Sequence, residues 1–283
     1  MTRVCVIGSV NTDLTFTVDA LPRPAQTVLA TALVSAPGGK GANQAVAAAR
    51  AGAQVQFVGA LGTDRAADAL LTHLHANGVG TDGTIVVAGP SGTAGIVVDG
   101  EAENMIVVAP GANARLVIDS PAMRTVIGAV DVALLQLEIP VSAAVAAARI
   151  ARAAGAIVIV NASPPNKSAA MPELAELTDV VVVNEAEADE WLWPSPHLVI
   201  TRGARGALYR VDGRETAIAA TAVEPVDTTG AGDVFAGVLA AAWPADPYGA
   251  LRRACAAGAL ATRKPGAGDC APTAEAIEDA LRA

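Results

Sequence analysis

The sequence predicts an α/β fold, in which a mostly parallel central sheet is covered by helices and a small separate β-sheet is appended. Short β-branched runs alternate with alanine-rich helical segments, which is the pattern of βαβ units. Of the 283 residues, 52% are apolar but only 3% are aromatic. The core must therefore consist of small aliphatic side chains that pack closely, as in helix-covered parallel sheets.

The strands expected in the main sheet are residues 4–7, 56–60, 131–137, 157–160, 180–183, 198–201 and 207–211. The helices expected between them are residues 41–51, 65–76, 142–154, 231–242 and 248–263. The crossover 184–201 is short for a connection between parallel strands, so we expect one brief helix in it.

Two stretches contain strand-like runs without intervening helices. Residues 14–17 with 27–34, and residues 84–87 with 95–98 and 105–108, are typical of antiparallel strands that lie apart from the main sheet. No repeat, low-complexity tract or linker is evident. We therefore expect a single domain, 1–283, into which lid segments at about 14–35 and 84–109 are inserted.

Charge and cysteine usage exclude several classes of protein. The net charge is −9 and no cationic stripe is present, which argues against a nucleic-acid partner. Cys5, Cys255 and Cys270 are far apart and form neither a disulfide framework nor a CxxC metal site. The chain starts directly with a strand-like run, and arginines interrupt its longest apolar stretches, so we expect a cytoplasmic protein without a membrane partner.

The most informative segment is residues 227–233, DTTGAGD, directly before a predicted helix. Glycines before a helix allow backbone N–H groups to converge on an anion, and the helix dipole favours a phosphate there. Asp233 would repel that phosphate unless it accepts a proton from an attacking nucleophile. The structural alternative is that Asp233 only caps the helix.

A second glycine cluster, residues 37–44, also opens a helix. Lys40 and Asn43 offer polar groups that suit a polyhydroxylated ligand as well as a phosphate. The segment lacks Walker A spacing, and an ordinary loop-to-helix turn is the alternative. Asn11 and Asp13 follow the first strand, at the sheet edge where α/β proteins bind ligands, although an Asx-rich turn would explain them too.

Asn184 and Glu187 follow another predicted strand and would project oxygen atoms toward the same edge. Magnesium held through water is one interpretation, and a solvated first turn of a helix is the other. His73, His75 and His197 have no nucleophile or metal-ligand spacing around them. The sequence also lacks a GxSxG nucleophile elbow.

In this order, the segments resemble the PfkB carbohydrate kinases, and within that family the ribokinase branch. The two strongest matches are residues 38–45, GGKGANQA, and residues 227–233, and the likeness spans nearly the whole chain. Smaller matches are at 8–13, 111–113, 136–138, 184–187 and 201–206. The resemblance implies a ribokinase-like three-layer sandwich with a mostly parallel central sheet and a small β-sheet lid.

The resemblance also implies an ATP-dependent kinase that phosphorylates a free sugar hydroxyl, first of all converting ribose to ribose 5-phosphate, with Asp233 as general base. The residues expected to hold the sugar are Asn11, Asp13, Gly39, Lys40, Asn43, Glu138 and Asp233. Backbone N–H groups of Gly230, Ala231 and Gly232 would form an anion hole. A homodimer through the lid is the expected assembly.

The cofactor expectations come from the same resemblance. Asn184 and Glu187 would organise Mg²⁺ and phosphate, the latter residue through water. The nucleotide would lie against Thr201, Gly203 and Gly206. K⁺ would be held beside the anion hole, mostly by backbone carbonyls, at Asp227, Thr229, Ala261, Lys264, Gly266 and Cys270.

Two departures from the family pattern are visible. The crossover after Glu187 is shorter than usual, and Asp269 and Cys270 stand where the family more often has proline and serine. Other functions remain open from sequence: another PfkB-type sugar or nucleoside kinase, or a sugar-binding regulator without catalytic activity. The intact Asp233 argues against the regulator.

Overall fold

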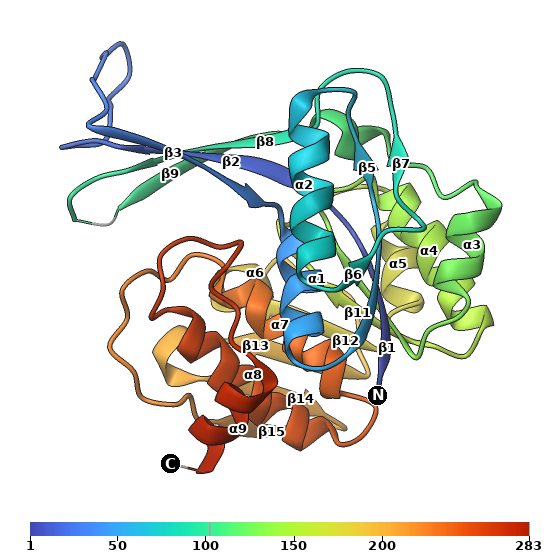
Figure 1. The fold of residues 1–283 in the computed structure, drawn as a ribbon. Coiled ribbons are helices and arrows are strands. Elements are labelled where there is room, and N and C mark those ends of the chain that lie inside the picture. The colour runs from blue at the N-terminus through green and yellow to red at the C-terminus, as the bar shows by residue number, and fades with distance from the viewer. Residues whose placement is uncertain (102, 283) are drawn as a thin grey trace.

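The computed structural model describes residues 1–101 and 103–282, and a nine-stranded sheet lies at its centre (Figure 1). The strand order is β15-β14-β13-β12-β11-β10-β1-β4-β6. These strands are β1 (Arg3–Ile7), β4 (Gln54–Val58), β6 (Val79–Gly80), β10 (Val132–Gln136), β11 (Ile157–Asn161), β12 (Val180–Asn184), β13 (His197–Thr201), β14 (Ala207–Val211) and β15 (Arg214–Ile218).

Pairing in the sheet is parallel from β13 through to β6. For example, Val6 of β1 is in register with Leu134 of β10 on one side and Phe57 of β4 on the other. At the other edge, β14 and β15 pair antiparallel, because tight connections join them to β13 and to each other. The predicted mostly parallel α/β sheet is confirmed.

Helices cover both faces of the sheet and complete three layers. The helices on one face are α1 (Lys40–Arg50), α2 (Arg65–Ala76), α7 (Ala231–Ala242) and α8 (Pro247–Ala261), and those on the other are α3 (Pro121–Ile127), α4 (Val141–Ala153) and α5 (Met171–Glu176). The remaining helices are α6 (Glu185–Ala188), α9 (Ala274–Arg282) and the 3₁₀ turns Gly111–Arg115 and Gly203–Arg205.

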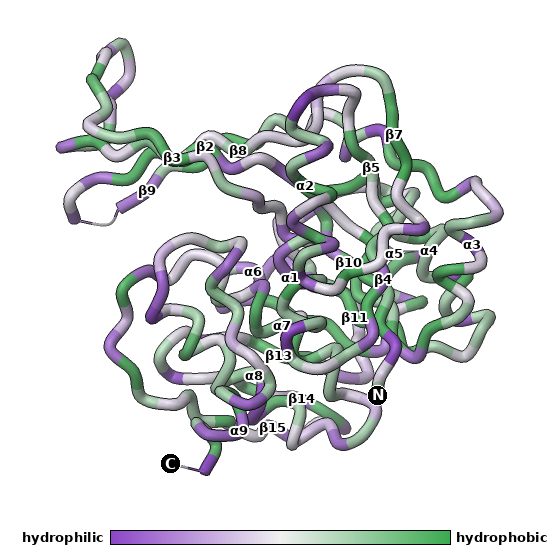
Figure 2. The backbone as a smooth tube through the Cα atoms, viewed as in Figure 1, coloured by the Kyte–Doolittle hydropathy of each residue, from purple (hydrophilic) through white to green (hydrophobic). Residues whose placement is uncertain are grey.

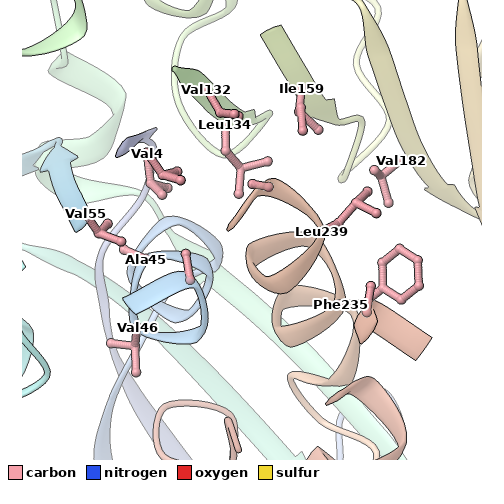
Figure 3. Packing of buried hydrophobic residues seen from close by; sticks show 14 of the residues in the cluster. Val4, Ala45, Val46, Val55, Val132, Leu134, Ile159, Val182, Phe235 and Leu239 are labelled. Carbon is pink, nitrogen blue, oxygen red and sulfur yellow. The ribbon is translucent and has the colours of Figure 1, made fainter. Parts of the chain in front are cut away.

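Close packing of small side chains lets α1 and α7 lie against each other under the sheet. Figure 3 shows Ala45 of α1 and Leu239 of α7 beside Val4 and Leu134 of the sheet, all of them buried. Gly237 of α7 has no room for a β-carbon, since one would lie 2.3 Å from the carbonyl oxygen of Gln44. The alanine-rich composition therefore brings the first turns of α1 and α7 close together, and both glycine clusters lie there.

The separate small sheet extends away from the layers (Figure 1). Its order is β3-β2-β8-β9, formed by β2 (Asn11–Thr17), β3 (Ala32–Gly38), β8 (Gly92–Val98) and β9 (Asn104–Ala109). Its neighbouring strands are antiparallel except for β2 and β8, which run parallel. Figure 2 shows apolar segments along its protruding strands.

Two sequence predictions about this lid were wrong. Residues 84–87 do not join it, because β7 (Ile85–Val86) pairs instead with β5 (Ala60–Leu61) beside the main body. Residues 27–30 are outside any strand, since β3 begins only at Ala32 and pairs through Gly38. Within the described ranges, no helix is both long and apolar enough to cross a membrane.

Candidate active site

Asp233 lies in the first turn of α7 and is 8% exposed. Asn43 Nδ2 donates to its Oδ2 at 3.1 Å, and Gln44 Nε2 donates to its Oδ1 at 3.0 Å. Both amides come from α1, so the two glycine-rich segments meet at this carboxylate. Asn43 and Asp233, which the sequence predicted to share a site, are in direct contact.

Glu138 and Lys40 lie nearby, at the carboxyl edge of the sheet. Ser9 Oγ donates to Glu138 Oε2 at 2.6 Å, and the backbone N–H of Lys40 approaches the same oxygen at 3.4 Å. Gly39 has a φ of +90°, and a β-carbon there would lie 2.8 Å from the backbone nitrogen of Asn11. Glycine is therefore required where α1 begins against the first strand turn.

The Lys40 side chain faces three acidic groups. Burial lowers its pKa, but the charges of Asp233, Glu138 and Glu187 raise it by more, so the ammonium is retained. Lys40, Asp233, Glu138 and Glu187, which were all predicted from the sequence, thus lie around one polar region. A cation in this position can offset negative charge on a transferring phosphoryl group.

Asp13, on β2, is the most perturbed carboxyl of this site. Burial raises its pKa to about 7, and the charges of Glu138 and Asp233 act in the same direction. Its buried Oδ1 has no hydrogen-bond partner. A hydroxyl-rich ligand would supply the missing donor.

Asn11 is oriented by Asn113, which follows β9 in a 3₁₀ turn. Asn113 Nδ2 donates to Asn11 Oδ1 at 2.8 Å and to the Val10 carbonyl at 3.2 Å, and Asn113 Oδ1 accepts from the Val10 N–H at 3.1 Å. Asn11 is therefore left with its amide N–H groups to offer a ligand. The arrangement joins the base of the lid to the main body.

A pocket of about 470 Å³ lies on the other side of the α7 N-terminus. The predicted nucleotide residues Thr201, Gly203 and Gly206 line it, together with Ala231 and Gly232 of the predicted anion hole. The sequence did not identify the rest of its wall, Ala204, Ala220, Thr221, Ala222, Val223, Pro225, Thr228, Phe235, Cys255, Gly258, Ala259 and Thr262. Mostly apolar walls with a few polar groups are typical of small-ligand pockets.

Gly230 adopts the left-handed conformation with a φ of +77° and starts α7. A β-carbon there would meet the Cα of Ala267 at 2.8 Å, so the loop after α8 packs directly on this turn. The N–H of Ala231 donates a hydrogen bond of 3.3 Å to the Thr228 carbonyl within this turn, which an anion would have to replace. First-turn N–H groups of a helix have no acceptor within the helix and are available to an anion.

Asn184 and Glu187 form a capping box on α6. Asn184 Oδ1 accepts from the Glu187 N–H at 2.8 Å, and Glu187 Oε2 accepts from the Asn184 N–H at 2.9 Å. Asn184 is exposed at the end of β12 and Glu187 is half-buried, and the charge of Glu187 reaches Lys40. A single half-buried carboxylate fits Mg²⁺ that is held mainly by phosphates and water.

Among the residues predicted to hold K⁺, Thr229 and Gly266 contact Asp227 directly. Its Oδ1 accepts from the Thr229 N–H and its Oδ2 from the Gly266 N–H, both at 2.8 Å. Burial raises the pKa of this carboxyl, but hydrogen bonds from the Thr229 side chain and from the N–H groups of Gly266 and Thr229 lower it by more. Cys270 Sγ contacts the Thr229 carbonyl at 3.9 Å, and Lys264 N–H donates to the Ala261 carbonyl. Carbonyl and carboxylate oxygens suit a hard monovalent cation.

No cluster of three or more His, Cys, Asp or Glu side chains that could hold a metal occurs in residues 1–101 and 103–282. The three cysteines are free and buried, and burial raises the pKa of the Cys270 thiol to about 11. Cys5 lies in the sheet and serves as a small core residue.

Sequence reasoning assigned no role to Gln44, Asn113, Asn161 or Ser9. Ser9, Gln44 and Asn113 lie in the segments 8–13, 37–44 and 111–113, which were identified from the sequence. All four residues are polar and buried, and a polar residue beside apolar neighbours is the signal that could have marked them. No comparable signal marks the pocket wall at 220–225, because small apolar residues there look like any loop.

Known proteins of one family match this protein over nearly its whole length. The model of the pfkB family carbohydrate kinases matches residues 1–274. The ribokinase of Bacillus subtilis is 40% identical over 302 residues, which cover 99% of this chain and 100% of that protein. The crystal structure of ribokinase from Thermotoga maritima covers 100% of both chains with a TM-score of 0.90 and 30% identity. Arabidopsis thaliana ribokinase, solved with ribose and ATP, covers 100% of this chain and 99% of its own with a TM-score of 0.89 and 26% identity.

Proposed function

The chain belongs to the PfkB family of carbohydrate kinases, and on that premise we propose that it transfers the γ-phosphoryl group of ATP to ribose, giving ribose 5-phosphate. The observation that carries the proposal is the position of Asp233. This buried carboxylate lies at a helix N-terminus, between an apolar pocket on one side and a set of polar sugar-binding candidates on the other.

In the proposed mechanism, Asp233 accepts the proton of the attacking sugar hydroxyl. Asn43 and Gln44 hold its two oxygens, so the carboxylate is oriented before the substrate arrives. The attacking oxygen then displaces ADP from the γ-phosphorus in line, and the proton stays on Asp233. Lys40 and the N–H groups of the first turn of α7 offset the charge on the phosphoryl oxygens.

The sugar is held by Asn11, Asp13, Gly39, Lys40, Asn43 and Glu138, which are close to Asp233. Asn11 donates hydrogen bonds, whereas Asp13 and Glu138 accept them. Such a set of donors and acceptors suits the hydroxyl groups of a free pentose. Thr201, Gly203 and Gly206 lie against the adenine nucleotide in the pocket.

Two metal ions complete the proposal. Mg²⁺ near Glu187 and Asn184 would neutralise charge on the ATP phosphates. K⁺ would be held by Asp227 and by carbonyls of the loop 261–270, where Asp227 already joins this loop to the anion-hole turn. Its contribution would be to fix that turn.

The first test is ADP release from Mg-ATP with D-ribose, for the native protein and Asp233→Asn. General base catalysis contributes about 10²- to 10⁴-fold, so we expect the variant to lose at least about 100-fold in kcat. Asparagine keeps the shape, its oxygen can still accept from Gln44, and the Asn43 amide can rotate to accept from the new N–H group, so folding should be retained. Unchanged turnover in Asp233→Asn would overturn the assignment of the base.

A substrate panel separates the proposal from its alternatives. Turnover with 2-deoxyribose, other sugars or nucleosides but not with ribose would assign a different PfkB kinase activity. Ribose binding without ADP release in the presence of Mg²⁺ and K⁺ would identify a sugar-binding regulator.

A further inference from the structure

Gln44 lies deepest among the groups around Asp233, with 0% exposure. Building on the proposed role of Asp233 as base, we infer that Gln44 is a positioning residue. It fixes the carboxylate through a buried chain of amides that runs back to the central sheet. The side chains in this chain of amides come from four different elements, α1, α7, β10 and β11, and its last acceptor is a backbone carbonyl of β12.

The chain consists of four hydrogen bonds. Gln44 Nε2 donates to Asp233 Oδ1 and to Asn161 Oδ1, both at 3.0 Å. Gln136 Nε2 donates to Gln44 Oε1 at 3.1 Å, and Asn161 Nδ2 donates to the Val182 carbonyl at 3.1 Å. The catalytic carboxylate is thus connected to three neighbouring strands of the sheet.

The direction of each hydrogen bond is fixed. The Val182 carbonyl can only accept, so Asn161 must present its nitrogen to it and its oxygen to Gln44. Gln136 donates to the oxygen of Gln44, which leaves the nitrogen of Gln44 for Asp233. A flipped Gln44 would place oxygen against both Asp233 and Asn161 and nitrogen against a donor. The amide therefore presents an N–H donor to a carboxylate oxygen of Asp233.

Packing alone does not explain an amide here. A buried amide costs free energy unless its hydrogen bonds are made, whereas an apolar side chain of similar volume would fill the space between α1 and the sheet without that requirement. Gln136 Oε1 has no hydrogen-bond partner, so this chain of amides does not satisfy all of its own polar atoms. What the chain of amides does provide is one N–H group that donates to Oδ1 of Asp233. Asn43 donates to the other oxygen, Oδ2.

The test is a double-mutant cycle with Gln44→Met and Asp233→Asn, in which kcat and the ribose dissociation constant are measured separately. Methionine is close to glutamine in volume but offers no N–H donor. We expect Gln44→Met to lower kcat by about 10- to 100-fold in the native background. This loss is smaller than the whole contribution of general base catalysis, about 10²- to 10⁴-fold, because Asp233 itself is still present. The ribose dissociation constant, measured calorimetrically without ATP, should change by less than about threefold, because the other sugar-binding residues are intact.

In the Asp233→Asn background, Gln44→Met should lower the residual kcat no further, since a residue that acts through Asp233 has nothing left to position. Equal losses in both backgrounds, or native kcat in the single variant, would overturn the inference. Gln56→Met is the matched control, because Gln56 is a β4 amide that bonds Asp82 outside the site. It should leave kcat unchanged.

Gln44→Glu keeps the experiment decisive if the methionine variant does not fold. Glutamate retains an acceptor for Gln136 but replaces the donor to Asp233 with oxygen, so we expect a loss of kcat at least as large. Failure of the proposed function looks different from failure of this inference. If Asp233 is not the base, Asp233→Asn is active. If Asp233 is the base but Gln44 does not position it, Asp233→Asn is inactive and both Gln44 variants have the native kcat.

Discussion

At the scale of single residues, Asp13 links the sugar site to pH. Burial raises the pKa of this carboxyl to about 7 in the folded protein, from the ordinary value of 3.8. Between these two values the folded state binds more protons than the unfolded state, so the free energy of unfolding must fall as pH rises. The stabilising contribution is complete below pH 3.8 and is lost by the time pH exceeds about 7.

We therefore predict that Asp13→Asn stabilises the ligand-free protein relative to native at pH 8 more than at pH 5. The measurement is chemical denaturation of both proteins at the two pH values, from which the difference in the free energy of unfolding is taken. An equal difference at both values would show that Asp13 titrates normally.

The sequence predicted the residues of the signature segments but not the contacts that orient them. Asp233, Asn43 and Lys40 meet as expected, because glycines dictate how each segment turns into its helix. The direction of an amide such as Gln44 depends on acceptors from distant strands. Nothing local in the sequence specifies those acceptors.

At the scale of elements, Arg50 ties the end of α1 to the loop after α8. Its Nη1 donates to the carbonyls of Asp269 and Ala271 at 2.9 and 3.0 Å, and its Nη2 pairs with the Asp269 carboxylate at 3.0 Å. Arg50 thus binds both the carbonyl and the carboxylate of Asp269. The same loop supplies Gly266 to Asp227 and Ala267 to Gly230.

Arg50→Met should release this loop and weaken the anion-hole turn. A hydrogen bond to a charged group contributes about 1.5–3 kcal/mol, so we expect kcat/KM for ATP to fall by about tenfold or more. Backbone hydrogen exchange at residues 266–271 should become faster. Arg152→Met removes a similar pair, with Asp179, far from the site and should alter neither quantity.

The capping box of α6 predicts a specific response to magnesium. Glu187 Oε2 is occupied by the Asn184 N–H, but its charge still reaches Lys40. Glu187→Gln keeps an oxygen for the cap and removes the charge. We expect the half-saturating Mg²⁺ concentration to rise by about tenfold while the melting temperature changes little, and an unchanged Mg²⁺ requirement would remove Glu187 from the metal site.

Element prediction succeeded where periodicity was long and failed where strands were short. The helices α2 and α7 have the predicted bounds, because each has a clear start signal and a long apolar face. Strand β7 was assigned to the lid because a two-residue strand has no periodicity, and only its neighbour β5 decides where it pairs.

At the scale of the whole molecule, the lid presents apolar side chains on the face that carries Asp13. Asp13 is in register with Ala94, and Ala94 with Val108, so these three residues share a face. By the same register, Thr15, Ile96 and Ile106 lie on that face, and Ile106 is 52% exposed. A second lid packed there would cover this apolar surface and exclude water from the sugar, as in the homodimer through the lid that the sequence resemblance implies.

If the protein is a homodimer through the lid, Ile106→Lys is predicted to convert it to a monomer in sedimentation experiments and to raise KM for ribose. Val107→Lys is the matched control, since Val107 is 73% exposed on the opposite face of the same strand. A lysine is costly only where the surface is covered by a partner, so Val107→Lys should leave the assembly and the KM unchanged. If both variants remain dimeric, the partner does not bind the Asp13 face of the lid. If both are monomeric, both faces of the lid contribute to the interface, and the prediction that dimerisation covers the sugar site specifically is wrong.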